Sequence, residues 1–478
     1  MTVSEFRKFA HHVADWMADY FETIEKFPVK SNVEPREIYN QIPDSPPEHP
    51  EDFEKIFQDF LSIILPGITH WQHPSFFAYF PANASFPSVL AEMLTATLAT
   101  QGMLWDTSPA AAELEEKMME WLKQSIGLPD IFQGVIYDGA STATLSAIIS
   151  AREKVSGFLI NISGFKPNHL FRVYASEEAH SSVEKAVKMA GIGRNNLVKI
   201  PTDENFLLLP NALEQAIEDD LSKGYIPLCV VATLGTTSCT AIDPLDQIAP
   251  ICAKYKLWMH IDAAYAGSAL ILPEYRWMIK GIEQADSFVF NPHKWLMTNF
   301  DCTAFFIKDK EVLLQAFSIL PEYLKTQWAT KVNNYSDWGP QLGRRFRALK
   351  LWFVLRSYGV SQLRQILRRH ILLARMLEEK MRKHPDVEIL APVNLNLICF
   401  RATCSEYKED EDKLNQLNQN LLTALNKSGK LYLSHTKLKG KFTLRMVIGQ
   451  TNVQESHIEK AWQEIQSKIK ELVGNLKI

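Results

Sequence analysis

The sequence predicts an α/β protein whose main domain is built on a mostly parallel sheet. Between about residues 84 and 350, short apolar runs rich in β-formers alternate with helical patterns. The runs are QGVIYD, LFRVYAS, PLCVVATLG, LWMHIDAAY and SFVFNP, and the helical patterns are TATLSAIISAREK, HSSVEKAVKMAG and PLDQIAPICAKY. Strands that are apolar throughout and alternate with helices are typical of a parallel sheet covered on both faces. In such sheets, ligands bind beyond the carboxyl ends of the strands.

The segments on either side of this region predict two smaller parts. Residues 1–83 contain two short helical patterns separated by the proline-rich stretch QIPDSPPEHPEDF. Because two short helices enclose too little apolar surface for a core of their own, we expect them to pack on another domain or another subunit. Residues 351–478 combine long helical patterns with the strand patterns VEILAP, LICFRAT, LYLSHTKL and FTLRMVIG, which predicts a small α+β domain. The charged run KEDEDK at 408–413 is interpreted as a solvated loop.

Composition and charge disfavour several classes of partner. The 51 Lys and Arg residues against 55 Asp and Glu give a net charge of −4, which provides no general attraction for nucleic acid or an anionic membrane. The opening MTVSEFRKFAHHVADWMADYF mixes charges among its apolar residues, so it does not resemble an export signal. No run of about 18 apolar residues predicts a membrane span. The six cysteines lack CxxC spacing, so we expect a reduced, cytoplasmic protein with neither disulfides nor a bound metal.

Asp262 and Lys294 are candidate functional residues because each follows a predicted buried strand. Asp262 ends the run LWMHID, where the alternative interpretation is a helix N-cap. A buried carboxylate is unfavourable unless a cation compensates it. Lys294 follows SFVFNPH and lies 32 residues after Asp262. The alternative interpretation of Lys294 is a surface residue whose stem lies on apolar surface while its ammonium reaches water. Burial lowers the pKa of a lysine, and a neutral amine forms a Schiff base with a carbonyl.

Two further strand ends complete a candidate cofactor site. In DGASTATLSA, residues 138–147, small residues between a strand and a helix indicate an anion cradle suited to a phosphate. The stretch matches neither GxGxxG nor GxxxxGK[ST], so a dinucleotide or a nucleoside triphosphate is not supported. His180 follows the run LFRVYAS, where an imidazole can stack on a flat ring; a packed or surface histidine is the alternative. A phosphate cradle, a stacking ring, a carboxylate for a pyridine nitrogen and a lysine for an aldehyde together fit pyridoxal 5′-phosphate.

The motif HIDAAYAG followed by NPHKW resembles the pyridoxal-phosphate-dependent group II decarboxylases of the aromatic-L-amino-acid decarboxylase family. The resemblance extends over essentially the whole chain through WQHPSFFAYFPA, SPAAAELEEKMMEWL, EEAHSSVEKA, ATLGTTSCTAIDPL, LGRRFRALKLWFVLRSYG and FTLRMVIG. It implies a fold-type I enzyme with a mostly parallel seven-stranded sheet in the large domain, 84–350. It also implies an N-terminal segment that packs on the partner subunit, and a homodimer with shared active sites that acts on a small amino-acid substrate.

The resemblance implies roles for individual residues. Lys294 would hold the cofactor's aldehyde as an imine, Asp262 would pair with the pyridinium, and His180 would stack on the ring. The expected cofactor-binding residues are Ala140, Ser141, His180, Thr233, Asp262, Ala264, Asn291, His293, Lys294 and Gly343, the last contributed by the neighbouring subunit. The expected substrate-binding residues are Trp71, Tyr79, Phe80, Pro81, Gln101, Met103 and Gly343, and His73 belongs to the same aromatic cluster.

Tyr335 lies in the polar stretch KVNNYSDWG, which is typical of a mobile loop, with a surface tyrosine as the alternative. In the family, the equivalent tyrosine protonates the substrate Cα after CO2 leaves, and a phenylalanine there is associated with aldehyde synthesis. Tyr335 therefore favours simple decarboxylation to an arylalkylamine. Gly343, where histidine decarboxylases carry serine, favours a bulky aromatic substrate.

The chain departs from the family's pattern in two places. Gln101 and Met103 stand where animal relatives have an apolar pair, which would allow Gln101 to hydrogen-bond a polar ring substituent. Tyr137-Asp138-Gly139 and Thr142 replace a Gly-Ser turn and a later glutamate beside the phosphate cradle. The alternative functions are aromatic aldehyde synthesis, decarboxylation of another amino acid such as histidine, transamination with Arg445 on the substrate carboxylate, and a cofactor-free binding protein.

Overall fold

The computed structural model describes residues 1–319 and 331–474, which divide into two compact units. Unit 1 comprises Met1–Pro81, Met376–Leu390 and the described part of Cys399–Ile478. Unit 2 comprises Ala82–Arg375, apart from residues 320–330, and Ala391–Ile398. The three domains expected from the sequence, 1–83, 84–350 and 351–478, stay a prediction.

Unit 2 is built on a sheet with the strand order β1-β7-β6-β5-β4-β2-β3 in the described part of the chain. Its strands are β1 (Gln133–Tyr137), β2 (Phe171–Ser176), β3 (Leu197–Ile200), β4 (Ile226–Thr233), β5 (Trp258–Asp262), β6 (Ser287–Phe290) and β7 (Thr303–Ile307). The neighbours from β3 to β6 are parallel, and β7 is antiparallel to both β6 and β1. The predicted mostly parallel seven-stranded sheet is thereby confirmed.

Two strands of this sheet were not predicted. β3 is a four-residue edge strand that carries the exposed Lys199, so its sequence lacks the apolar run of the central strands. β7 follows β6 without a long crossover helix, because an antiparallel neighbour needs only a short connection. A search for strands that alternate with helices therefore misses β7.

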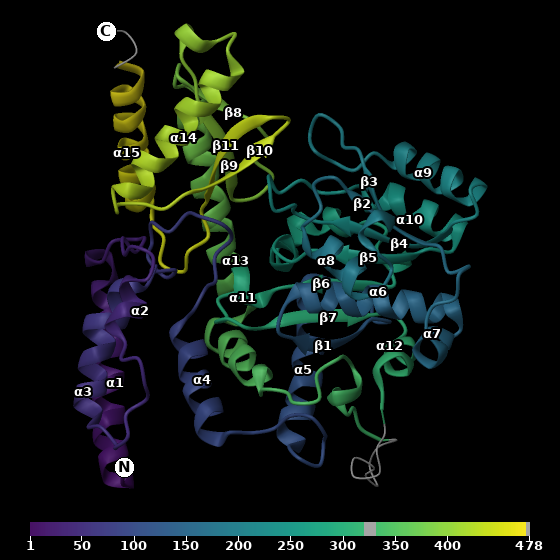
Figure 1. Ribbon diagram of the computed structural model, residues 1–478, viewed down its shortest axis with the longest axis horizontal. Helices are drawn as coiled ribbons and strands as arrows, with labels where there is room; N and C mark the ends of the chain where they lie inside the picture. The colour runs from purple at the N-terminus through teal and green to yellow at the C-terminus, as the bar shows by residue number, and fades with distance from the viewer. Residues whose placement is uncertain (320–330, 475–478) are drawn as a thin grey trace. The chain divides into compact units, whose positions relative to one another are not determined.

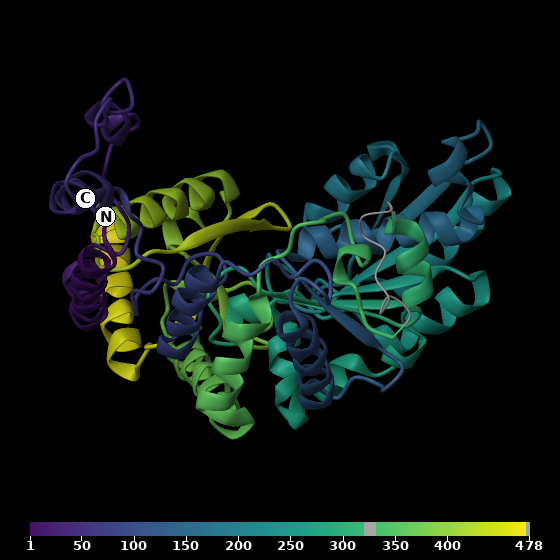
Figure 2. The ribbon, with the colours of Figure 1, turned by 90° about the horizontal axis from the view of Figure 1, so that it is seen from below.

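Helices lie on both sides of the strands in Figures 1 and 2. They are α4 (Phe86–Leu98), α5 (Pro109–Ile126), α6 (Ala140–Ser156), α7 (Leu159–Ser163), α8 (Ser182–Met189), α9 (Pro210–Ser222), α10 (Leu245–Tyr255), α11 (Pro292–Trp295) and α12 (Lys310–Phe317). α6 and α8 cover alternate residues of the central strands, including Val173, Ala175, Cys229 and Val231. α9 and α10 pack against each other and against β4. Burial on both faces explains why these strands are apolar throughout.

β5 and the turn that follows it are closely packed. His260 is fully buried, with Nδ1 2.9 Å from Ser287 Oγ and Nε2 3.3 Å from Thr144 Oγ1. Burial lowers the pKa of His260 to about 4, so its imidazole is neutral near pH 7. A Cβ at Gly267 would clash with Phe290 of β6, so glycine allows the turn after β5 to lie against β6.

Unit 1 contains N-terminal helices and a small α+β domain. Its elements are α1 (Val3–Thr23), α2 (Glu37–Gln41), α3 (Phe53–Asp59), the end of α13 (Arg347–Arg382), β8 (Val387–Ile389), most of β9 (Leu397–Ala402), α14 (Glu411–Lys427), β10 (Ser434–Leu438), β11 (Lys441–Val447) and α15 (Glu455–Gly474). The strand order is β10-β11-β9-β8 among the described residues. α1 begins with a capping box between Thr2 and Glu5, contacts α3 through stacked Phe9 and Phe53 rings, and has no buried residue.

The interpretation of 408–413 as a loop is wrong in part. The Asp410 side chain accepts the Lys413 N–H at 3.0 Å and caps α14, which begins at Glu411. Acidic residues are favourable at a helix N-terminus, so the charged run starts a helix. None of the helices in the described ranges is both long and apolar enough to cross a membrane.

Unfolding between pH 6.5 and 4 tests the burial of His260. The pKa of His260 is lowered from 6.5 to about 4 in the folded chain, so the unfolded chain binds more protons in this window. The free energy of unfolding should therefore fall as the pH falls, by up to about 1.4 kcal/mol per pH unit from this group. Urea titrations of His260→Asn should show a shallower decline than the wild type. The exposed His435→Asn is the control, and equal slopes for all three proteins would contradict the prediction.

Candidate active site

The carboxyl ends of three neighbouring parallel strands place polar groups at one edge of the sheet. Thr233 ends β4 and pairs in register with Asp262, which ends β5. Asn291 follows β6, which is parallel to β5, and its N–H donates to the Ala264 carbonyl at 3.0 Å. The strand order thus brings together residues that lie up to 58 positions apart in the chain.

Asp262 is a buried carboxylate, only 4% exposed. Its Oδ1 accepts the Ala264 N–H at 3.0 Å, which satisfies one of its acceptor sites and fixes the turn after β5. A carboxylate this deep requires a positive partner. The alternative interpretation, a helix N-cap, does not apply, because a turn and not a long helix follows the strand.

Lys294 supplies positive charge at this edge. It lies in the single-turn helix α11, and its N–H donates to the Asn291 carbonyl at 2.9 Å. Burial lowers the pKa of the Lys294 ammonium, and the negative charge of Asp262 acts in the opposite direction. Because a lowered pKa increases the fraction of neutral amine, Lys294 is suited to act as a nucleophile toward an aldehyde.

His180 lies within electrostatic range of both groups. Burial lowers its pKa; the Asp262 charge raises it and the Lys294 charge lowers it further. Its Nδ1 accepts the Ser182 N–H at 3.2 Å and lies 2.8 Å from Ser182 Oγ. The ring is therefore neutral with its proton on Nε2, which suits a residue that stacks on a flat ring.

The predicted anion cradle falls at the start of α6. Gly139 is the N-cap in an extended conformation and offers no side chain to the helix terminus. The first turn contains Ala140 and Ser141, whose N–H groups lie too early in the helix to have an intrahelical acceptor. These donors and the positive end of the helix dipole suit a phosphate.

Two side chains near Lys294 add donors. Asn291 Oδ1 accepts the Thr303 hydroxyl at 2.8 Å, so the Nδ2 hydrogens are its remaining donors. His293 Nδ1 accepts the Cys302 N–H at 3.0 Å, which places its proton on Nε2. Burial lowers the pKa of His293 to about 3, and the Lys294 charge acts in the same direction. Both residues are thus neutral donors fixed by contacts with the start of β7.

The buried hydroxyl of Thr233 is a further feature that fits a bound pyridoxal phosphate. Thr233 Oγ1 is buried and has no hydrogen-bond partner within the described residues. A buried hydroxyl without a partner is unfavourable unless a ligand provides one. Thr233 is in register with Asp262 at the end of β4, so a polar cofactor bound at these strand ends would provide a partner for its hydroxyl.

Asp243 is a buried carboxylate beside the candidate site that the sequence interpretation did not single out. Its carboxylate accepts N–H groups from Thr233 at 2.8 Å and from Leu208 at 3.0 Å, and it fixes the end of β4. Burial raises the pKa of Asp243 to about 6. The motif TSCTAIDPL contains this aspartate, and an Asp-Pro pair just after a strand end was the available signal.

Three of the expected substrate-binding residues lie near β1, the strand at one edge of the sheet: Gln101, Met103 and Gly343. Gln101 Oε1 accepts the Arg344 N–H at 2.6 Å, and a Cβ on Gly343 would lie 3.3 Å from Gln101 Nε2. Arg344 forms a buried ion pair with Glu115 of α5 and donates to the Ile136 carbonyl of β1. Since β7 and β6 lie between β1 and β5, these residues belong to a different part of the sheet from Asp262.

Tyr335 lies in the same region. It is buried, although the sequence alone favoured a tyrosine on the surface. It begins the 3₁₀ turn Tyr335–Asp337 and is 2% exposed. Its ring centre lies 5.4 Å from that of Trp338, and the Arg344 guanidinium lies over the ring at 5.0 Å. Burial raises the pKa of the Tyr335 phenol well above its ordinary value.

The predicted aromatic residues of the N-terminal segment lie in unit 1. The rings of Trp71 and Tyr79 are stacked 5.9 Å apart and are 39% and 49% exposed. Phe80, next to Pro81, is buried under the Arg445 guanidinium at 5.4 Å. Tyr79 has a φ of +54°, an unfavourable value for a tyrosine, which presents its ring on the surface of the unit.

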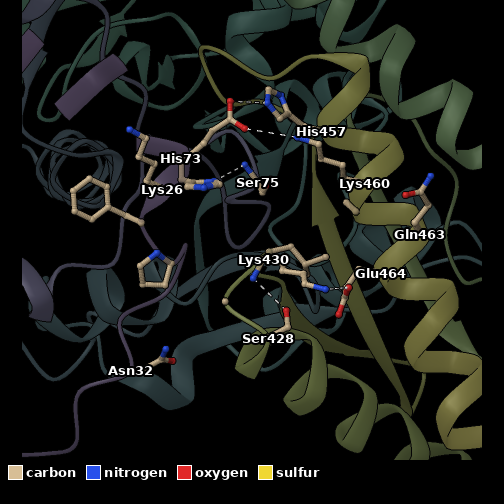
Figure 3. A pocket seen from close by; sticks show the side chains of 16 residues that line it. Lys26, Asn32, His73, Ser75, Ser428, Lys430, His457, Lys460, Gln463 and Glu464 are labelled. Carbon is tan, nitrogen blue, oxygen red and sulfur yellow. Dashed lines mark hydrogen bonds and ion pairs between the residues drawn. The ribbon is translucent and has the colours of Figure 1, made fainter. Parts of the chain in front are cut away.

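His73 does not share the surface of Trp71 and Tyr79. It lines a cavity of about 720 Å³ within unit 1, where its Nδ1 accepts the Ser75 N–H at 2.9 Å (Figure 3). The same cavity is lined by the ion pair of Lys430 with Glu464 and by His457. Its polar wall differs from the aromatic surface expected for a substrate ring.

Comparison with known proteins agrees with this chemistry. Residues 35–403 match the pyridoxal-dependent decarboxylase conserved domain. The chain is 44% identical to phenylacetaldehyde synthase of Arabidopsis thaliana, over 98% of this chain and 96% of that protein. It is 43% identical to aromatic-L-amino-acid decarboxylase of Cavia porcellus, over 97% of each. Its fold matches tryptophan decarboxylase of Catharanthus roseus in complex with L-tryptophan, with a TM-score of 0.92, 40% identity and 99% coverage of both chains.

The fold and the strand-end residues define a pyridoxal-phosphate-dependent enzyme of fold type I. The chain belongs to the pyridoxal-dependent decarboxylase family. It is a carboxy-lyase, and its cofactor is pyridoxal 5′-phosphate.

Replacing Thr233 with valine tests the fit of the cofactor. Valine keeps the shape of threonine, and the lost hydroxyl has no hydrogen-bond partner among residues 1–319 and 331–474. The apoprotein should therefore keep its unfolding temperature, while its affinity for pyridoxal phosphate falls about fivefold to tenfold through the loss of one hydrogen bond. Thermal unfolding and a spectrophotometric titration measure the two effects. Equal affinity together with a less stable apoprotein would contradict the proposed fit.

Proposed function

We propose that this protein removes CO2 from L-aromatic amino acids to form arylalkylamines. The observation that carries the proposal is the buried Asp262 carboxylate in electrostatic range of the partly buried Lys294 amine, with His180 in electrostatic range of both. Relatives that include tyrosine, tryptophan and aromatic-L-amino-acid decarboxylases support an aromatic substrate.

Bound pyridoxal phosphate supplies a sink for the electron pair that remains on the substrate Cα after CO2 leaves. In this proposal Asp262 holds the proton on the pyridine nitrogen, and Lys294 provides the amine that holds the cofactor's aldehyde. The His180 ring would stack on one face of the cofactor, and Ala264 would pack on the other. The N–H groups of Ala140 and Ser141 hold the phosphate, together with the donors of Asn291 and His293.

Tyr335 is proposed as the acid that protonates the substrate Cα. Its raised pKa keeps the phenol protonated, which a general acid requires. Because the family resemblance assigns Gly343 to the neighbouring subunit, and Arg344 next to it donates to the Tyr335 carbonyl, we propose that the Tyr335 and Gly343 region serves the active site of a second copy. An arylalkylamine, and not an aldehyde, is the expected product.

The surface of α4 supports assembly into a homodimer. Five apolar residues of α4 recur at three- and four-residue steps, and each is 40 to 61% exposed: Phe86, Leu90, Met93, Leu94 and Leu98. A helix with an exposed apolar stripe of this length is typical of an interaction surface. A second copy is the proposed partner, and a cytoplasmic location stays a prediction from the cysteine pattern.

Product analysis with an amino-acid mixture tests the reaction. The purified enzyme should release CO2 and form amines from tryptophan, 5-hydroxytryptophan, DOPA, tyrosine or phenylalanine, and Lys294→Ala should abolish product formation because the amine is lost. The exposed Lys254→Ala is the control and should keep full activity. Formation of histamine alone, or no CO2 from any amino acid, would contradict the proposal.

Tyr335→Phe tests the proton donor. Removing the hydroxyl should lower the amine yield about 10²- to 10⁴-fold. With dissolved O2 as the oxidant and water as co-reactant, product should be diverted toward the aldehyde, CO2, ammonia and hydrogen peroxide. Tyr275→Phe, which also removes the hydroxyl of a buried tyrosine, is the matched control and should form amine normally. Amine as the main product of Tyr335→Phe would remove Tyr335 from this role.

A further inference from the structure

Gln101, one of the residues that depart from the family's pattern, is tied to the backbone of a single segment. Residues 334–344 are here named the Tyr335 segment. The Gln101 side chain accepts the N–H of Arg344 at 2.6 Å, and the next residue, Gly102, donates its N–H to the Arg344 carbonyl at 2.9 Å. The amide oxygen of Gln101 is therefore engaged by the protein backbone.

Tyr137 and Asp138, which also depart from the pattern, bind the middle of the Tyr335 segment. The Tyr137 hydroxyl donates to the Trp338 carbonyl, and Gln341 Nε2 donates to Asp138 Oδ2 at 3.2 Å. A Cβ on Gly339 would lie 2.8 Å from the Tyr137 hydroxyl, so the tyrosine ring fills the space beside this glycine. The unusual turn beside the phosphate cradle thus contacts the segment and not only the cradle.

The start of the segment is attached to the residues around Met103. Ser336 N–H donates to the Met103 carbonyl, and Trp105 N–H donates to the Asn334 side chain, each at 3.0 Å. With Gln101, Tyr137 and Asp138, these contacts fix the segment along its length.

Tyr335 and Gly343 are linked to each other within the segment through Arg344. Arg344 Nη1 donates to the Tyr335 carbonyl at 3.1 Å, and Arg344 itself follows Gly343. The buried Glu115 holds the same guanidinium. A shift of the 338–344 backbone would therefore change the position of both Gly343 and Tyr335.

We propose that Gln101, Tyr137 and Asp138 are positioning residues, which hold the Tyr335 segment so that Gly343 and Tyr335 are presented in one arrangement. The proposal rests on the proposed function, which assigns Gly343 to substrate binding and Tyr335 to proton transfer. It differs from the expectation that Gln101 hydrogen-bonds a polar ring substituent, because the amide oxygen of Gln101 accepts the Arg344 N–H. Residue 101 acts on specificity through Gly343, because its Nε2 lies 3.3 Å from the space that a side chain at 343 would occupy.

Hydrogen exchange and kinetics of the cofactor-loaded enzyme test the proposal. Tyr137→Phe removes one tie and Gln341→Ala removes another; Gln341 is exposed, so its replacement does not threaten folding. Each variant should exchange the amides of 338–344 about fivefold faster, the effect of one net hydrogen bond on local opening. Each should also raise the KM for the aromatic substrate about threefold or more, because Gly343 is presented less uniformly.

Tyr174→Phe is the matched control, because it also removes the hydroxyl of a buried tyrosine. Tyr174 lies on β2, and its hydroxyl donates to Asp220 at 2.9 Å. It should leave exchange in 338–344 and the KM unchanged. Wild-type exchange in both Tyr137→Phe and Gln341→Ala would overturn the proposal, as would faster exchange with an unaltered KM. Failure of the proposed function is distinguishable, because it appears in the products of the wild type and Tyr335→Phe, whereas the exchange rates do not depend on the reaction.

Discussion

Burying the Asp262 carboxylate at the end of β5 is unfavourable unless positive charge lies nearby, and the surrounding residues are arranged to meet this requirement. Burial lowers the pKa of His260 to about 4 and that of His293 to about 3, so these rings are neutral near pH 7, and desolvation lowers the pKa of His180 in the same direction. The Lys294 ammonium opposes the Asp262 charge. In the proposed function, the protonated pyridine nitrogen of the cofactor would take over that role. The same electrostatic requirement thus serves stability without the cofactor and chemistry with it.

The parallel sheet brings the other polar groups of the candidate site close to the Asp262 carboxylate. Thr233 and Asp262 are in register, and the Asp243 carboxylate holds the β4 end through the Thr233 N–H. Asn291 is oriented by Thr303 at the start of the antiparallel β7. Short range contacts between neighbouring strands therefore fix the donors, so the site depends on the sheet more than on any flexible loop.

The sequence predicts the parts of the protein that local patterns encode. The central strands, the aspartate and lysine at their ends and the start of α6 are all visible as apolar runs followed by polar or small residues. The antiparallel β7 escaped detection because nothing in its own sequence distinguishes it from other short apolar runs. The contact of Gln101 with Arg344 spans 243 residues, and that of Tyr137 with Trp338 spans 201, so neither is visible in a local pattern. The burial of Tyr335 depends on the same distant contacts, which is why the polar sequence around it favoured an exposed position.

The central claim, that Lys294 is the amine that holds the cofactor, is tested most directly by locating the covalent attachment. The enzyme loaded with pyridoxal phosphate is reduced with borohydride, digested and examined by peptide mass spectrometry. The phosphopyridoxyl group should be found on the peptide that contains NPHKW, at Lys294. Stoichiometric labelling of a different lysine, with Lys294 unmodified, would contradict the account.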